Sequence, residues 1–238
     1  MSAIEKATRR IGKVFARATD GQNGTQSGEY LLPKDYEHKQ LHIAVVSEDN
    51  PSILTDVRTS RVIQMIVDTV YETYQQDAFL TINLPATQNP SAISNLLEAL
   101  PFQFSQPRED VPNLYQARIT GQNYSLAFTL KFGFDGRAEV VRMAQRVAAN
   151  GGDITLENAS SYKDLPDLPD PDFKIYTGQP YTMRFNNDGV WEQAYTEFDA
   201  TQDPFVQLTK STLQQKLYIF TKRARRFGGL NGLTAKSR

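Results

Sequence analysis

The chain has 238 residues, a formal net charge of -1 and no cysteine. The lack of cysteine excludes disulfide bonds, cysteine-ligated zinc, iron–sulfur clusters and thiol catalysis. No apolar run approaches the roughly 20 residues that a membrane helix needs, so no membrane span is expected. With 39% hydrophobic residues, among them 13 Phe and 11 Tyr, the chain can form a sizeable core, and this excludes disorder throughout.

The small net charge conceals two basic ends around an acidic body. Residues 1–17 carry a net charge of +4, residues 210–238 carry +8, and the remainder therefore carries -13. Basic ends of this kind attract anionic partners, which include nucleic acid, a membrane surface and the acidic body of a neighbouring copy.

The first 35 residues are expected to form a basic amphipathic arm followed by a linker. Between residues 4 and 15, apolar residues recur at helical spacing on one side and most of the basic residues lie between them. Residues 20–29 have the polar, Gly-rich composition of a flexible linker. Three interpretations remain open for the arm: a helix docked on its own domain, a mitochondrial presequence, or a segment that binds outside the domain.

Alternating strands and helices are expected next. A strand at residues 41–47 precedes a long helix at 55–76, a second strand at 79–84 and a short helix at 89–100 that begins with Asn89-Pro90. A further strand near 115–119 is expected to pair with the following strand as an antiparallel hairpin.

The pattern from 123 to 157 predicts a strand, a helix and a second strand. Apolar residues alternate from Tyr124 to Phe134, and a helix follows from Arg137 until Asn150-Gly151-Gly152. Residues 153–157 alternate again and predict a strand. The side of the helix expected to be buried consists of Val140, Val141, Ala144, Val147 and Ala148.

The last third begins with a proline-rich acidic connector at residues 165–172, which runs extended into 174–177. A hairpin is expected over 181–198, around Asn186-Asn187-Asp188-Gly189. The final helix, from Pro204 to Arg226, carries an apolar stripe and ends in a basic turn.

These elements predict an α+β fold with a mixed, largely antiparallel sheet. Two main helices, near 55–76 and 137–149, are expected to pack on this sheet, with a basic N-terminal arm and a basic C-terminal helix outside it. The expected domain organisation is an arm and linker at 1–35, a single α+β domain at 36–203, and a C-terminal helix and basic tail at 204–238.

No catalytic, cofactor-binding or metal-binding constellation is recognised. Phosphate-binding glycine loops are absent, and the two histidines, His38 and His42, lie in or beside an expected strand, which does not suit a shared metal. The carboxylates between residues 164 and 203 are interpreted as solvated or as partners of basic arms. No cofactor and no small-molecule substrate is therefore expected.

The features together resemble bacteriophage virion components in general, which implies a non-enzymatic assembly subunit of neck, tail-completion or baseplate type. Copies of the chain would form a large homo-oligomer by exchanging basic arms, in a virion assembled in the host cytoplasm. The residues expected to contact a neighbouring subunit or an anionic partner are Lys6, Arg9, Arg10, Lys13, Arg17, Lys222, Arg223, Arg225 and Arg226.

Two alternatives stay open. A nucleocapsid or packaging protein would bind nucleic acid nonspecifically through the same basic ends. A hydrolase or transferase would assemble its site from distant residues, and clustering of His38 or His42 with carboxylates in one deep pocket would support this class.

Overall fold

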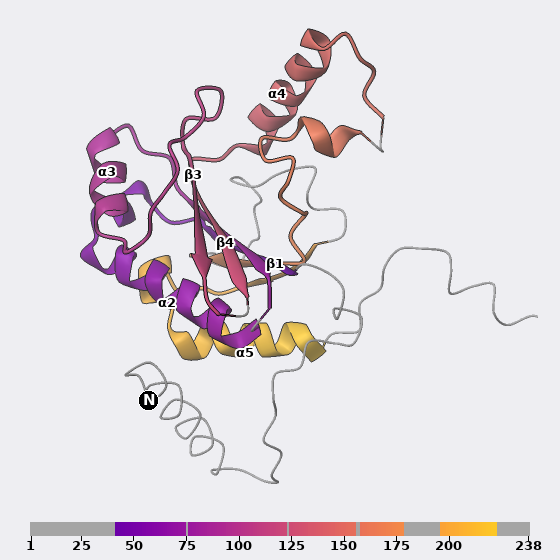
Figure 1. Ribbon diagram of the computed structural model, residues 1–238. Helices are drawn as coiled ribbons and strands as arrows, with labels where there is room; N and C mark the ends of the chain where they lie inside the picture. Colours follow the sequence, from indigo (N-terminus) through magenta and orange to yellow (C-terminus); the bar gives the residue numbers. More distant parts are fainter. Residues whose placement is uncertain (1–40, 75, 123, 156–157, 179–195, 223–238) are drawn as a thin grey trace, which may run out of the picture. The chain divides into compact units, whose positions relative to one another are not determined.

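A computed structural model describes residues 41–74, 76–122, 124–155, 158–178 and 196–222 (Figure 1). These residues form one six-stranded sheet with the order β3-β4-β2-β1-β5-β6. The only antiparallel pair within it is β3 with β4, and all other neighbours are parallel. The strands are β1 (Leu41–Ser47), β2 (Ala78–Leu84), β3 (Leu114–Thr120), β4 (Ser125–Phe132), β5 (Phe173–Thr177) and β6 (Glu197–Ala200).

Four α-helices lie in the described part of the chain: α2 (Val57–Tyr74), α3 (Pro90–Glu98), α4 (Gly136–Ala149) and α5 (Lys210–Lys222). The short 3₁₀ helices are η2 (Pro51–Thr55), η3 (Ala159–Tyr162) and η5 (Phe205–Gln207). Side-chain caps fix two of the helix starts. The Asn89 side chain accepts a hydrogen bond from the backbone of Ser91, and that of Asp135 accepts one from Arg137.

The apolar core lies between one face of the sheet and α2, α3 and α5. Ile43 of β1, Leu80 of β2 and Ile66 of α2 are fully buried there. The rings of Phe173 on β5 and Phe220 on α5 stack with their centroids 4.6 Å apart, so α5 packs firmly on the sheet. Burial of this kind contributes roughly 25 cal/mol per Å² of apolar surface.

The opposite face of the sheet is buried and polar. Asn83 of β2 and Lys131 of β4 are register partners near the carboxyl ends of their strands, and both are about as buried as the core residues. Lys174 on β5 and His42 on β1 are buried as well. Polar groups in such positions require partners, and the Lys131 ammonium lies over the Phe134 ring.

The expected largely antiparallel sheet is wrong, and the fold is a mixed α/β arrangement with mainly parallel strands. All seven residues of β1 are buried, as in strands covered on both faces, whereas a solvated antiparallel strand would alternate. The strand expected at 153–157 is also wrong for its described residues, 153–155, which are irregular and leave Ile154 52% exposed.

The structure also differs from the sequence-based expectations in two of the helices. The final helix begins at Lys210 and not at Pro204, because the intervening residues form η5 and a turn. The expected buried side of α4 is largely wrong, since Val140 and Val141 are exposed while Glu139, Met143 and Val147 are buried. The N-terminal arm and linker, and the hairpin expected over 181–198 up to residue 195, lie outside the described residues.

Candidate functional site

The order of the strands points to one position on the sheet edge. From β1 the chain builds β2, β4 and β3 on one side and later returns to place β5 and β6 on the other side. The switch point is therefore between β1 and β5, whose parallel register brings Ser47 beside Thr177 at their carboxyl ends. Open parallel sheets bind their ligands at such a point. The candidate site consists of residues 47–50 and 177–178.

The Asp49 carboxylate joins three segments at this point. Its Oδ2 accepts a hydrogen bond from the Ser47 hydroxyl at 2.8 Å and one from the backbone N–H of Phe205 at 2.8 Å. The Thr177 hydroxyl lies 3.5 Å from the same oxygen, at the limit of a hydrogen bond. Asp49 thus holds together the ends of β1 and β5 and the start of η5.

Gly178 makes the close approach of these segments possible. Its φ of 74° is in the left-handed region, and an added Cβ would lie 2.7 Å from the Asp49 Oδ1. The backbone N–H of Gly178 donates to the Asp203 carbonyl at 2.9 Å, and that of Glu48 donates to the Thr177 carbonyl at 3.2 Å. Backbone hydrogen bonds therefore fix the segments on either side of the Asp49 carboxylate.

The connection from this site to α2 is fixed by local caps. The Asn50 side chain accepts a hydrogen bond from the Ser52 backbone at 3.0 Å, which starts η2. Asp56 accepts from the backbone and guanidinium of Arg58, and these hydrogen bonds lower the pKa of Asp56 to about 2. Only η2 and Asp56 therefore separate the candidate site from the N-terminus of α2.

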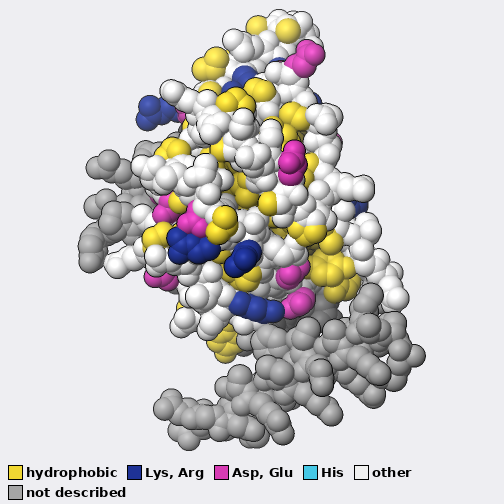
Figure 2. All heavy atoms as spheres, turned by 90° about the vertical axis from the view of Figure 1, so that its left-hand side faces the viewer, with side chains coloured by type: hydrophobic (Ala, Val, Ile, Leu, Met, Phe, Trp, Pro, Cys, Tyr) yellow, Lys and Arg dark blue, Asp and Glu magenta, His cyan; other side chains and the backbone are white. Residues whose placement is uncertain are grey.

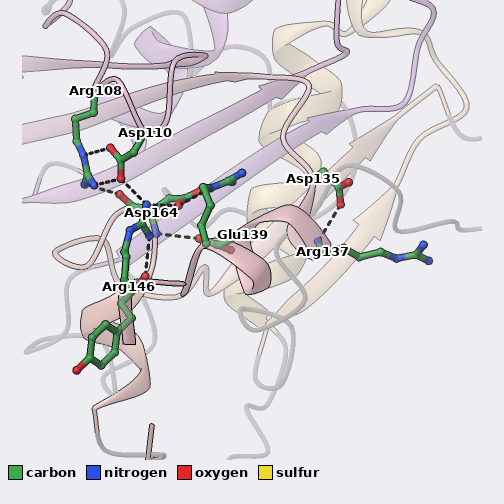
Figure 3. A network of polar contacts seen from close by, with 9 residues as sticks. Arg108, Asp110, Asp135, Arg137, Glu139, Arg146 and Asp164 are labelled. Carbon is green, nitrogen blue, oxygen red and sulfur yellow. Dashed lines mark hydrogen bonds and ion pairs between the residues drawn. The ribbon is translucent and has the colours of Figure 1, made fainter. Parts of the chain in front are cut away.

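A second polar cluster, the α4 ion network, surrounds the buried carboxylate of Asp164 (Figure 3). Arg142 donates to it through Nε at 3.0 Å and Arg146 through Nη2 at 2.9 Å. Arg108 donates to the Asp164 carbonyl at 3.1 Å and to Asp110, which Arg146 also contacts at 2.7 Å. These arginines are paired with acids, so the network fastens α4 to the segments before β3 and after η3.

The hydrogen bonds from Arg108 and then from Arg146 hold the pKa of Asp110 at about 2. The hydrogen bond to Asp164 raises the pKa of Arg142, although burial opposes the increase. Burial acts most strongly on Arg146 and lowers its pKa, but hydrogen bonds to Asp110 and Asp164 outweigh burial, so the pKa is raised overall.

The expected interaction set stays a prediction, because nearly all of its residues lie outside the described part of the chain. Lys222 is the last residue of α5, and the other eight residues of the expected interaction set lie outside the described residues. Of the two histidines, His42 is described and buried. Its ring nitrogens lie 2.7 Å from the Pro169 carbonyl and 2.8 Å from the Thr81 hydroxyl, so it joins the connector to β2.

The described residues contain no group of three or more His, Asp or Glu side chains that could hold a metal. None of the helices in the described part of the chain has the length and apolar character needed to cross a bilayer. On the face of the molecule shown in Figure 2, Lys and Arg side chains are interspersed with Asp and Glu and do not form a basic stripe.

Asp49, Thr177 and Gly178 were missed in the sequence, although a weak signal for them exists. Polar residues follow directly after the buried stretch of β1, and Thr177-Gly178 follow the apolar end of β5. The two stretches can be recognised as one site only when β1 and β5 are known to be parallel neighbours. The hydrophobic pattern alone does not show which strands pair.

Comparison with known proteins identifies the family. The family described as "Putative undecaprenyl diphosphate synthase" matches residues 104–228, which is more than half of the chain. Isoprenyl transferase 2 of Bradyrhizobium diazoefficiens is 31% identical over 124 residues, 49% of this chain and 48% of that protein. The isoprenyl transferase of Fusobacterium nucleatum is 30% identical over 139 residues, 56% of this chain and 59% of that protein. The chain spans about half the length of the curated relatives it matches.

Solved structures agree at the level of the fold. The crystal structure of a probable undecaprenyl diphosphate synthase from Campylobacter jejuni has a TM-score of 0.55 and 18% identity, over 81% of this chain and 100% of that chain. Lavandulyl diphosphate synthase from Lavandula x intermedia, in complex with dimethylallyl diphosphate, has a TM-score of 0.54 and 15% identity, over 79% and 98%.

These matches overturn the functional predictions made from the sequence. The non-enzymatic virion subunit, its virion localisation and the nucleocapsid alternative are wrong, because the relatives are cellular isoprenyl transferases. The expectation of no small-molecule substrate is wrong for the same reason, since the family acts on isoprenoid diphosphates. Basic ends around an acidic body describe only the distribution of charge along the chain, and many classes of protein have such a distribution. With residues 104–228 matched, the chain belongs to the undecaprenyl diphosphate synthase family.

Proposed function

We propose that this protein is an isoprenyl transferase that uses isoprenoid diphosphates. The family match carries the proposal, because it extends from the segment before β3 through α5 and so includes Thr177 and Gly178 of the candidate site and also Phe205 beside it. Asp49 lies outside the matched range but is bonded to Phe205 within it. The relatives' names mention undecaprenyl diphosphate and farnesyl diphosphate, and one structural neighbour is bound to dimethylallyl diphosphate.

Transfer of an isoprenyl group breaks the bond between its terminal carbon and the diphosphate oxygen, and forms a bond from that carbon to a carbon of the accepting isoprenoid diphosphate, which then loses a proton. Negative charge develops on the leaving diphosphate, and an enzyme must stabilise it. Phosphate-bound Mg²⁺ usually needs only one or two protein carboxylates, since the phosphates and waters supply the other ligands. Within the described residues Asp49 Oδ1 accepts no hydrogen bond, whereas Oδ2 is held by Ser47 and Phe205. Asp49 therefore fits the role of a carboxylate that positions a metal-bound diphosphate.

The test is a transfer assay on the full chain. Isotope-labelled dimethylallyl and farnesyl diphosphates are incubated with unlabelled isoprenoid diphosphates and Mg²⁺, and products are separated by chain length and identified by mass spectrometry. We expect longer isoprenyl diphosphates together with released diphosphate. Failure of the wild-type protein to lengthen any isoprenoid diphosphate would contradict the proposal.

The Asp49→Asn variant separates the charge of Asp49 from its structural bonds. Asparagine retains an oxygen that can accept from the Phe205 N–H and the Ser47 hydroxyl. We expect an unchanged melting temperature and a decrease of kcat/KM on the order of 100-fold, similar to the loss of one charge-stabilising group. Wild-type activity in this variant would remove Asp49 from the mechanism.

A further inference from the structure

A separate buried cluster lies around α4 and η3, outside the main apolar core. None of the described residues from 133 to 172 belongs to the core that α2, α3 and α5 form with the sheet. Met143 and Val147 of α4 and Ala159 of η3 are nevertheless buried. Among the helices α4 packs chiefly on η3, and Figure 1 shows both of them away from α2, α3 and α5. Residues 136–164 therefore form a unit of their own, the α4 module.

The polar bonds inside the α4 module are buried. The buried Asp164 carboxylate accepts hydrogen bonds from Arg142 and Arg146. The Asp164 backbone N–H donates to the Glu139 carboxylate at 3.2 Å. The Arg146 guanidinium also donates to the Tyr162 carbonyl at 2.8 Å. Breaking such a group would leave a buried charge uncompensated, so α4 and the segment around η3 are expected to stay together.

The bonds that join the module to the segment before β3 are more exposed. Arg146 contacts Asp110 at 2.7 Å, and Arg108 donates to the Asp164 carbonyl at 3.1 Å. The side chains of Arg108 and Asp110 are 52% and 47% exposed. Ion pairs with this exposure contribute little to stability and are screened by salt. This attachment is therefore weaker than the bonds within the module.

The chain enters and leaves the module at two fixed points. Gly133 is anchored on the sheet, because its backbone N–H donates to the Leu84 carbonyl at 2.8 Å. The first pivot therefore lies between Gly133 and the start of α4. At the other end the buried Lys163 ammonium contacts Asp170 at 2.9 Å, and residues 166–167 between them are exposed. A module held at these two points can swing only by leaving the segment before β3.

We propose that the α4 module is a hinged flap, and that Arg108 and Asp110 are the latch that closes it on the segment before β3. The flap begins at the carboxyl end of β4, two strands and roughly 10 Å from β1, so it shares one edge of the sheet with the candidate site. A 14-residue helix released from the latch is marginally stable in water, so opening exposes the amides and buried side chains of α4. Salt screens the latch and makes opening more frequent.

Thiol labelling detects the opening, because the natural chain has no cysteine. Val147→Cys on α4 and Val62→Cys on α2 place thiols at positions that are 9% and 8% exposed, so their accessibility in the closed structure is matched. With excess maleimide we expect Val147→Cys to be labelled at least about tenfold faster, because a weakly attached unit opens before the core does. Equal rates would overturn the flap.

Arg108→Gln in the Val147→Cys protein tests the latch. Arg58→Gln is the matched control, since Arg58 also pairs with an aspartate two positions away at 2.6 Å and is 55% exposed. Loss of a partly exposed ion pair should raise the labelling rate roughly two- to fivefold for Arg108→Gln alone. The effect should shrink at about 1 M salt, where the Debye length is about 3 Å. The same rate in both variants would show that Arg108 does not close the flap.

Hydrogen exchange shows whether α4 and η3 open together. We expect the amides of both elements to exchange faster than those of α2, and Arg108→Gln to accelerate both by the same factor. Acceleration confined to the last turn of α4 would indicate fraying of the helix end and would contradict the flap. None of these measurements needs substrate, so their outcome is independent of transferase activity.

Discussion

At the scale of single residues, Asp49 and Gly178 depend on each other. The carboxylate occupies the space that a side chain at residue 178 would need, since an added Cβ would lie 2.7 Å from Oδ1. The left-handed φ of 74° also favours glycine at this position. Small size and backbone freedom at Gly178 therefore allow a negative charge to be held at the switch point of the sheet.

Gly178→Ala should reduce both stability and transferase activity. A residue other than glycine at this φ costs roughly 1–3 kcal/mol, and displacement of Asp49 adds to that cost. Gly151→Ala is the control, because Gly151 has a similar φ of 61° but nothing within 4 Å of an added Cβ. We expect urea unfolding to show a larger loss for Gly178→Ala, and activity to fall in that variant alone. Equal losses of stability in both variants would mean that the Asp49 contact contributes nothing.

At the scale of elements, α4 is held by ion pairs where most helices are held by an apolar stripe. Buried Asp164 receives two arginines from α4, and Arg108 joins them from the segment before β3. Removing one member of a buried ionic group leaves another charge uncompensated, which is costly. Directional bonds of this type fix the rotation of the helix about its axis, and this rotation exposes Val140 and Val141.

The network should give the protein an acid-sensitive component of stability. The pKa of Asp110 falls from 3.8 to about 2 in the folded chain. A lowered folded pKa means that the stabilisation is complete above the unfolded value and is lost as the pH falls from about 4 through 2. Since Asp110 is 47% exposed, the effect should be small and should weaken in high salt.

Comparison of wild type with Asp110→Asn isolates this contribution. The free energy of unfolding, measured by urea titration at several pH values, should fall less steeply for the variant between pH 4 and pH 2. The difference between the two proteins should decrease when salt is added. Identical pH profiles would show that the two arginines do not stabilise the ionised carboxylate.

At the scale of the whole molecule, the mainly parallel sheet brings residues that are far apart in sequence to one edge. Thr177 and Asp49 are 128 positions apart, and Phe205 and Asp49 are 156 apart. Because β1, β5 and η5 meet there, a ligand bound at the proposed site would contact several elements at once. Binding to the folded state alone stabilises the entire domain.

Dimethylallyl diphosphate should accordingly raise the melting temperature. At a concentration 100 times its Kd, a ligand specific for the folded state adds about 2.7 kcal/mol to the free energy of unfolding. We expect a concentration-dependent increase by scanning calorimetry in the presence of Mg²⁺, and a smaller increase for Asp49→Asn. Inorganic diphosphate is the control that separates recognition of the head group from recognition of the prenyl group. The absence of any shift with isoprenoid diphosphates would argue against the proposed site.

Much of the element order could be predicted from the sequence, whereas the strand partners could not. The pattern of residues 41–47 predicts β1, and the Asn89-Pro90 pair predicts the start of α3, because burial period and caps are local properties. Long-range pairing has no comparable local signal. The hairpin rule correctly paired β3 with β4, but it could not show that β4 continues into a parallel sheet.

The sequence by itself determined where most of the helices and strands lie and that cysteine chemistry is absent, since these follow from composition and from periods of a few residues. Only the tertiary structure decided the strand order, the exposure of Val140 and Val141 and the contacts of Asp49 with Gly178 and Phe205. The physical reason is that a 3.6-residue spacing of apolar residues identifies an apolar side of a helix but does not show which other element packs against it. Around α4, hydrogen bonds from Arg142 and Arg146 of the helix and from Arg108 to the buried Asp164 outweighed that side, so Val140 and Val141 lie at the surface.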